Sequence, residues 1–161
     1  MYIHLRHCRE IEDLASKIYL KFSQNPAYAQ EVREVFQKLS ADERGHARHI
    51  DLVLQASNQE VDALPRVSGE RLKGVKNRAD ELYRIACRNE MDEEKALQMA
   101  VQIEQEFMEV HIQNVLQFYN PKLAELFDKL NAEDQRHIDT LNKCLKEWRS
   151  RVENKKSPGS K

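Results

Sequence analysis

Apolar residues recur every three or four positions in four long segments of the chain, the spacing of a helix with one buried face. The first segment ends near Asn25-Pro26, where the proline disfavours a continuing helix. The other three cover residues from about 27 to 56, 92 to 119 and 121 to 151. Asp92 suits a helix N-cap, and Pro121 suits the first helical position. The pattern therefore predicts four long helices.

Between the second and third segments the periodicity weakens. Residues 57–76 contain Gly and Pro and are predicted to be a crossover, followed by a short extra helix over about 78–88. Two tight hairpins joined by one long crossover are the connectivity of ferritin-like bundles. We therefore predict an all-α, ferritin-like four-helix bundle over residues 1–152, although another all-α domain could show the same helices. Residues 153–161 are polar and are predicted to be a disordered tail.

The chain repeats itself. The stretch from Phe36 to His46 can be laid on that from Phe127 to His137 at an offset of 91, with Phe, Lys, Leu, Ala and His coinciding. Ile11-Glu12 matches Ile103-Glu104 at an offset of 92. The first helix pair thus resembles the second, which favours a bundle with pseudo-two-fold symmetry.

Charged and imidazole side chains interrupt the apolar faces at matched points of this repeat. Glu12 and Glu104 each lie within an apolar helical stripe. On the second and fourth helices, a carboxylate and a histidine three residues apart continue the apolar line: Glu43 with His46, and Asp134 with His137. Chance alone gives about one such pair at this composition. Their registration in the repeat, rather than their number, is what indicates a site.

Four buried carboxylates would repel one another, and burying them is costly unless they are paired or bind metal. Two divalent cations would balance four negative charges, and neutral imidazoles would add nitrogen ligands. One carboxylate–histidine pair from each of two helices, with one glutamate from each of the others, is the arrangement of di-iron bundles. We therefore predict a two-metal site on Glu12, Glu43, His46, Glu104, Asp134 and His137, which would be the catalytic residues through their metals.

Three further residues lie near the predicted ligands. Tyr19 lies about two turns from Glu12, where it could be a radical or proton relay or simply a core tyrosine. His111 holds the matching place on the third helix and could contact a ligand or be a packed histidine. Glu133, beside Asp134, points about 100° away around the helix and is a poorer candidate ligand.

Composition excludes several classes of function. Lys and Arg (26) nearly balance Asp and Glu (27), which argues against a nucleic-acid binder. The three cysteines are widely spaced without a C-x-x-C pair, so no disulfide framework or rubredoxin-like knuckle is expected. No signal peptide or 18-residue apolar stretch is present, and we expect a cytoplasmic protein without a membrane partner.

The stretches from Glu12 to Tyr19 and from Ala41 to His46 resemble the helix-one and helix-two patterns of the rubrerythrin-like branch of the ferritin-like superfamily. The resemblance covers about residues 5–150 and implies a homodimer with two iron ions, an oxidoreductase that reacts with hydrogen peroxide or dioxygen in oxidative-stress defence. It also implies an external electron donor such as a rubredoxin-type protein, because the chain has no rubredoxin domain.

The chain departs from this family at two further points. Peroxidase members carry an extra glutamate one turn beyond the helix-three ligand, where this chain has Phe107, and Asp134 is shorter than glutamate. Two alternatives to the peroxidase-type enzyme therefore stay open: a ferroxidase that oxidises Fe(II) as its substrate, and a non-enzymatic metal-binding or interaction module. Manganese or a mixed Mn/Fe pair also fits oxygen-rich ligands.

Overall fold

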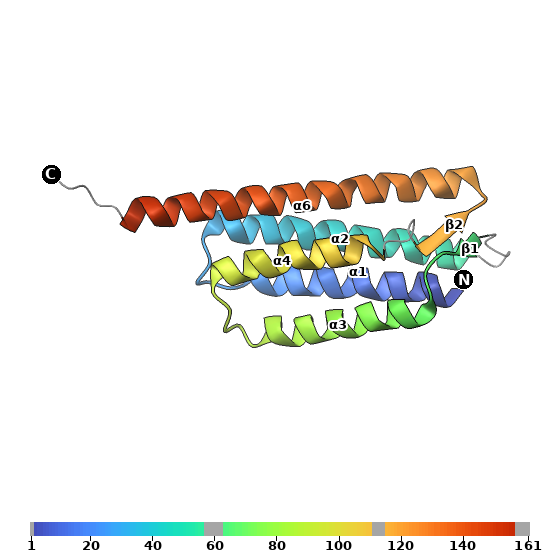
Figure 1. Ribbon diagram of the computed structural model, residues 1–161, viewed down its shortest axis with the longest axis horizontal. Coiled ribbons are helices and arrows are strands. Elements are labelled where there is room, and N and C mark those ends of the chain that lie inside the picture. The colour runs from blue at the N-terminus through green and yellow to red at the C-terminus, as the bar shows by residue number, and fades with distance from the viewer. Residues whose placement is uncertain (1, 57–62, 111–114, 157–161) are drawn as a thin grey trace.

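The computed structural model describes residues 2–56, 63–110 and 115–156, and within them helices dominate (Figure 1). The helices are α1 (Tyr2–Ser23), α2 (Gln30–Ala56), α3 (Gly69–Cys87), α4 (Glu93–Met108) and α6 (Pro121–Lys156). Two short strands, β1 (Ala63–Pro65) and β2 (Leu116–Phe118), pair in antiparallel fashion. The predicted all-α four-helix bundle is confirmed, with α1, α2, α4 and α6 as its helices.

The direction of the helices explains the crossover. Figure 1 shows α1 and α6 running one way along the bundle and α2 and α4 running the other way. Because α2 and α4 are parallel, the chain has to return along the bundle between them, and α3 makes that return. It packs chiefly against α1. The crossover is therefore largely a helix on the outside of the bundle.

The extra helix is longer than predicted, because α3 begins at Gly69 rather than near residue 78. The Ser68 hydroxyl caps it by accepting a hydrogen bond from the backbone N–H of Arg71 at 3.2 Å. Leu72 is fully buried, so the first turns already face the core. Gly69 and Gly74 are poor helix formers, and they hid this start in the sequence pattern.

The third long helix is shorter than predicted. We expected it to reach Tyr119, but α4 ends at Met108, and Leu116–Phe118 forms β2 instead. This strand pairs with Ala63–Pro65, and the N–H of Arg66 also donates to the carbonyl of Val115 at 2.7 Å. The strand partner lies about 50 residues away in sequence, so the local pattern contained no sign of it.

The predicted helix starts at Asp92 and Pro121 are confirmed. The Asp92 carboxylate accepts a hydrogen bond from the N–H of Lys95 at 2.8 Å, and α6 begins at Pro121. At its other end α6 continues to Lys156, four residues past the expected end of the domain at residue 152. Within the described ranges no helix is long and apolar enough to cross a membrane.

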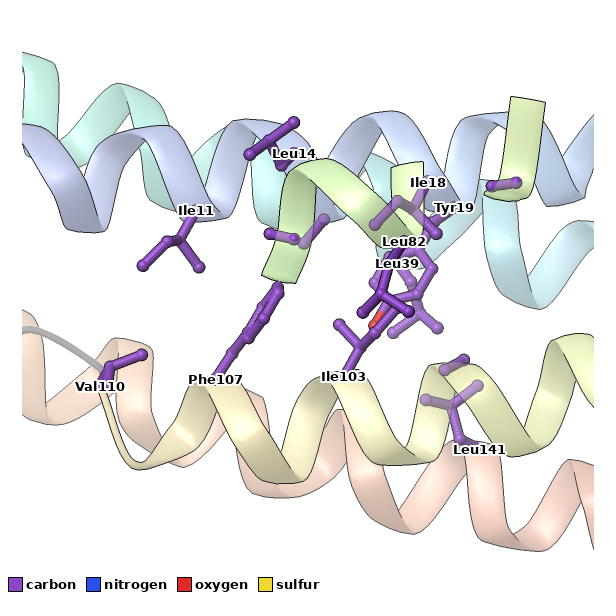
Figure 2. Packing of buried hydrophobic residues seen from close by; sticks show 14 of the residues in the cluster. Ile11, Leu14, Ile18, Tyr19, Leu39, Leu82, Ile103, Phe107, Val110 and Leu141 are labelled. Carbon is purple, nitrogen blue, oxygen red and sulfur yellow. The ribbon is translucent and has the colours of Figure 1, made fainter. Parts of the chain in front are cut away.

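The apolar faces of the helices meet in one core that surrounds a polar centre. Figure 2 shows Ile11 and Ile18 of α1, Ile103 and Phe107 of α4 and Leu82 of α3 among the side chains that fill it. These residues follow the predicted helical spacing. The core therefore holds the inward faces of α1 and α4 close together, and both of those faces also carry a glutamate.

A pair of serines fixes the approach of α1 to α2. The Ser16 hydroxyl donates to the Ser40 carbonyl at 2.8 Å, and the Ser40 hydroxyl donates to the Ser16 carbonyl at 2.8 Å. Both residues are buried, and small side chains let the two helices come close. Ser16 lies one turn after Glu12, and Ser40 lies three residues before Glu43. The pair therefore sets the register of two helices that supply the polar centre.

We predict that Ser40→Ala lowers the free energy of unfolding by about 1 kcal/mol, because it removes a buried hydrogen bond between two helices. Urea denaturation would measure the loss. Ser23→Ala is the control, since the Ser23 hydroxyl is half-buried and bonds only within α1, to the Leu20 carbonyl. Equal effects of the two substitutions would contradict a role for Ser40 in joining the helices.

Candidate metal centre

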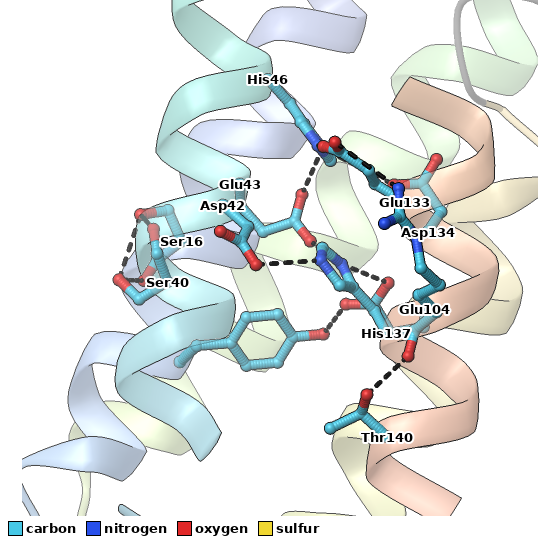
Figure 3. A network of polar contacts seen from close by, with 12 residues as sticks. Ser16, Ser40, Asp42, Glu43, His46, Glu104, Glu133, Asp134, His137 and Thr140 are labelled. Atoms are coloured by element: carbon cyan, nitrogen blue, oxygen red, sulfur yellow. Dashed lines mark hydrogen bonds and ion pairs between the residues drawn. The ribbon is translucent and has the colours of Figure 1, made fainter. Parts of the chain in front are cut away.

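The residues predicted to hold metal come together between the four helices of the bundle (Figure 3). They are Glu12 on α1, Glu43 and His46 on α2, Glu104 on α4, and Asp134 and His137 on α6. Each of the six is buried, with 6% or less of its surface exposed. Burial on this scale is unusual for carboxylates and calls for a compensating charge.

Glu43 lies at the middle of the centre and faces both histidines. Its Oε2 atom is 3.2 Å from His46 Nδ1, and its Oε1 atom is 2.9 Å from His137 Nδ1. The two imidazole rings stand nearly parallel, with centroids 5.8 Å apart. A carboxylate with one oxygen directed at each of two nitrogen donors has the arrangement of a bridge between two metal ions.

Two of the remaining carboxylates each approach one histidine, and the third lies near both. Glu12 Oε2 lies 3.8 Å from His46 Nδ1, and Glu104 Oε2 lies 3.6 Å from His137 Nδ1. Asp134 comes within 3.6 Å of His46 Nδ1 and also groups with His137.

Two clusters of possible ligand atoms result: Glu12, Glu43 and His46 form one, and Glu43, Asp134 and His137 form the other, each with atoms within 4.8 Å of one another. Glu43 belongs to both. The described residues thus offer donors for two neighbouring ions.

The outer nitrogens of both rings are held by carboxylates from the opposite helix. His46 Nε2 on α2 lies 3.1 Å from Glu133 on α6, and His137 Nε2 on α6 lies 3.3 Å from Asp42 on α2. With its Nε2–H donated outward, each ring would present a lone pair on Nδ1 to the centre. Sequence analysis missed this role of both carboxylates.

A signal for these outer partners was present in the sequence. Asp42 and Glu133 coincide at the same offset of 91 as the candidate ligands that follow them. Glu133 does point away from Asp134, as expected, but that direction leads to His46 of the neighbouring helix. Each repeat therefore supplies the outer support for the histidine of the other repeat.

Tyr19 and Phe107 complete the surroundings of the centre. Tyr19 is fully buried, and its hydroxyl donates to Glu104 Oε1 at 2.5 Å. Burial and the neighbouring charge of Glu104 raise the pKa of Tyr19 well above its ordinary value, so it stays a donor. Phe107 is buried in the core one turn beyond Glu104, so this position offers no carboxylate. His111 lies outside the described residues.

The four carboxylates of the centre have too few positive charges near them to balance their own. Burial, with the charges of Glu12 and Glu43, raises the pKa of Asp134 to about 8. Burial opposes charge on the rings, yet hydrogen bonds and charges from neighbouring glutamates raise the pKa of His46 to about 12 and of His137 to about 10. Without metal, the centre compensates its carboxylates by holding protons.

The donor set fits metal better than protons. The Nδ1 atom of His137 is buried and faces two carboxylates, with Glu43 Oε1 2.9 Å and Glu104 Oε2 3.6 Å away. A buried imidazole nitrogen that faces two carboxylates is a natural ligand atom for a cation placed between them. Two divalent cations would replace the protons on the rings and balance four carboxylates. The chain thus has a candidate centre for two metal ions.

Comparison with known protein families gives a match to the family model Rubrerythrin over residues 5–145. No curated protein and no solved structure matches the chain. The matched range includes all six candidate ligands and the two outer carboxylates.

We predict that Asp42→Asn and Glu133→Gln each weaken metal binding by about 10- to 100-fold, because a ligand histidine loses the partner that fixes its tautomer and orientation. Competition with a chelating indicator would measure the affinity. Asp139→Asn is the control, since Asp139 is an exposed carboxylate on α6 whose bond is to Gln135. Affinities within about twofold of the unmodified protein would contradict this role.

The metal-free protein should lose stability as the pH rises. His46 and His137, whose pKa values are raised by folding, stabilise the fold in full below the ordinary value of 6.5, and this contribution declines as the pH rises through about 10 and about 12. The folded state also holds the Asp134 proton more tightly than the unfolded state, and the stability that this gives is lost as the pH rises from 3.8 through about 8. Thermal unfolding with metal chelated, over a pH series, would measure the trend.

Asp134→Asn serves as the control, because it should flatten the part of that decline that lies below a pH of about 8. An unfolding midpoint that stays level or rises between pH 6.5 and about 10 would contradict the prediction.

Proposed function

The chain belongs to the rubrerythrin family, a ferritin-like di-iron family, and we propose that it is a di-iron oxidoreductase that reduces hydrogen peroxide or dioxygen. The proposed ligands are Glu12, Glu43, His46, Glu104, Asp134 and His137. The observation that carries the proposal is the position of Glu43, with one oxygen directed at each histidine. A single metal would not need a carboxylate shared between two such groups.

In this proposal His46 and Glu12 would hold one iron ion, and His137 and Glu104 would hold the other. Glu43 and Asp134 lie near both histidines and would be available to both ions. Iron bound there would supply the redox chemistry. Oxygen-rich ligands discriminate poorly between iron and manganese, so iron rests on the family.

The protein's own groups orient this centre and exclude water. Asp42 and Glu133 hold the outer edges of the rings, and the Tyr19 hydroxyl holds one oxygen of Glu104. Tyr19 is also the candidate relay, because its hydroxyl is in hydrogen-bond contact with a proposed ligand. The apolar core around the polar cluster keeps the charges in a low-dielectric surrounding, where they act more strongly.

Phe107 bears on which oxidant is used. Peroxidase-type relatives place a glutamate one turn beyond the helix-three ligand, and here a buried aromatic ring occupies that position. A peroxide-specific exchange of ligands at this position is therefore not part of the proposal. Oxidation of Fe(II) as a substrate is the second candidate function, and it does not need that exchange. The family resemblance further implies a homodimer and a rubredoxin-type electron donor, and both belong to the proposal.

The test is anaerobic loading with Fe(II), followed by mixing with hydrogen peroxide or dioxygen in separate runs. We expect the chain to bind two iron ions and to oxidise them faster than Fe(II) is oxidised without protein. Absorbance would monitor the oxidation. Glu43→Ala should lose at least one metal, because it removes the shared carboxylate, whereas Asp139→Asn should behave as the unmodified protein.

The outcomes separate the two candidates. Repeated uptake and release of iron during oxidation would favour the ferroxidase, and stable retention of iron through several cycles with a reductant would favour the oxidoreductase. No accelerated oxidation by either oxidant would exclude both enzymes. Full metal content in Glu43→Ala would show that the ligand set is wrong.

A further inference from the structure

A groove between α2 and α6 opens beside the candidate metal centre. Its volume is about 490 Å³, and it reaches His137 together with the two outer carboxylates Asp42 and Glu133. Figure 3 shows both carboxylates beside the histidines of the centre. The cavities between α3 and α4, beside the start of α1 and beside the end of α6 reach none of the six candidate ligands. The groove thus leads from solvent to the outer edge of a proposed ligand.

Other sides of the bundle are packed more closely. The Ser16–Ser40 pair holds α1 against α2. Apolar side chains, Leu82 of α3 among them, fill the space between α1 and α4 (Figure 2). In contrast, α2 and α6 meet beside the centre through the polar contacts of Asp42 and Glu133 with the histidines of the opposite helix. Because the candidate ligands are buried, an ion has to pass between helices to reach them, and this side offers the least apolar barrier.

The charge of the groove suits a cation. Outside the centre, its lining has four carboxylates and two basic side chains, which give a net charge of −2: Glu31, Glu34, Asp42, Glu133, Lys38 and Arg136. Glu31 and Glu34 lie about two to three turns before Asp42 along α2, so negative charge continues along the groove toward the centre. A cleft lined mainly by one sign of charge draws in ions of the opposite sign and speeds their association.

The groove also has room for a hydrated ion. Six water molecules around a divalent cation take up roughly 180 Å³, at about 30 Å³ for each water. The groove, at about 490 Å³, exceeds this volume. An ion can therefore reach the outer carboxylates with its water shell, and carboxylate oxygens are ligands that replace such waters.

The two outer carboxylates lie where such an exchange would take place. The side chains of Asp42 and Glu133 are 35% and 44% exposed, whereas the rings that they contact are buried. A half-exposed contact of this kind is weak enough to be exchanged for a contact with an arriving ion. We propose that the groove is the entry route for divalent cations, in which Asp42 and Glu133 receive the ion and pass it to the buried ligands. This inference rests on the proposed function, which requires that the centre take up metal.

A matched pair of variants tests the route by blocking it. Thr140 is exposed and lines the groove, whereas Asn142 is exposed on α6 and turned about 200° away. The full chain without metal is mixed with Co²⁺ in a stopped-flow instrument, and the visible absorbance of bound cobalt follows uptake. The loaded chain is then mixed with excess EDTA, and the loss of this absorbance follows release.

Thr140→Trp should slow uptake and release by about tenfold each, because the indole fills the groove and raises one barrier that both directions share. The equilibrium affinity for Co²⁺ should therefore stay unchanged. Asn142→Trp should alter neither rate. Both sites are on the surface, so the fold should tolerate either ring.

A second pair of variants tests the role of charge. Glu31→Gln combined with Glu34→Gln brings the net charge of the lining from −2 to 0 with little change in side-chain size. Uptake of Co²⁺ should slow by about tenfold at low ionic strength. About 1 M NaCl should remove most of the difference, because it screens charges beyond a few ångströms. Glu70→Gln combined with Glu81→Gln is the control, since both carboxylates are exposed on α3, which packs chiefly against α1.

The outcomes distinguish this inference from the proposed function. Unchanged rates in Thr140→Trp, or equal slowing in Asn142→Trp, would overturn the entry route. Slow uptake with a matching loss of affinity would also overturn it, because the substitution would then act on the centre itself. Equal rates in the two double variants would refute the argument from charge. A chain that takes up Co²⁺ by this route but does not oxidise Fe(II) overturns the proposed function and leaves the route standing, whereas a chain that binds no metal overturns both.

Discussion

The structure depends on the burial of four carboxylates and two imidazoles at one level of a helical bundle. Such a cluster repels itself in a low-dielectric core unless cations or protons balance it. In the metal-free centre, the raised pKa values of Asp134 and both histidines favour bound protons. Metal ions would compete with those protons, so the same charges that make the metal-free fold sensitive to pH would make metal binding strong and pH-dependent.

The internal repeat explains how the centre is supported. Each histidine faces the shared Glu43 with Nδ1 and a carboxylate of the opposite helix with Nε2. Asp42 and Glu133, equivalent in the repeat, cross between α2 and α6 to hold each other's histidine. The link is therefore reciprocal, and neither half of the chain could complete the centre alone. Tyr19 adds a contact from α1, since its hydroxyl donates a hydrogen bond to Glu104.

One side of the bundle is covered by an extra helix, and another side has a groove. On one side α3 packs against α1 and covers it, which follows from the need to return the chain between two parallel helices. On the other side the groove between α2 and α6 reaches the outer edge of His137. The groove reaches this edge where the outer carboxylates are half-exposed to solvent.

The sequence by itself determined the helical class and the helix starts at Asp92 and Pro121, because these depend on local spacing. It also determined which six polar residues meet between the helices, because they are in register in the internal repeat. It did not reveal the full length of α3 or the end of α4, since glycines obscured the first and strand pairing with a distant segment decided the second. Only the tertiary structure showed Asp42 and Glu133 as outer partners and the groove beside them. Those features depend on which faces of α2 and α6 lie opposite each other, and no spacing within one helix specifies that.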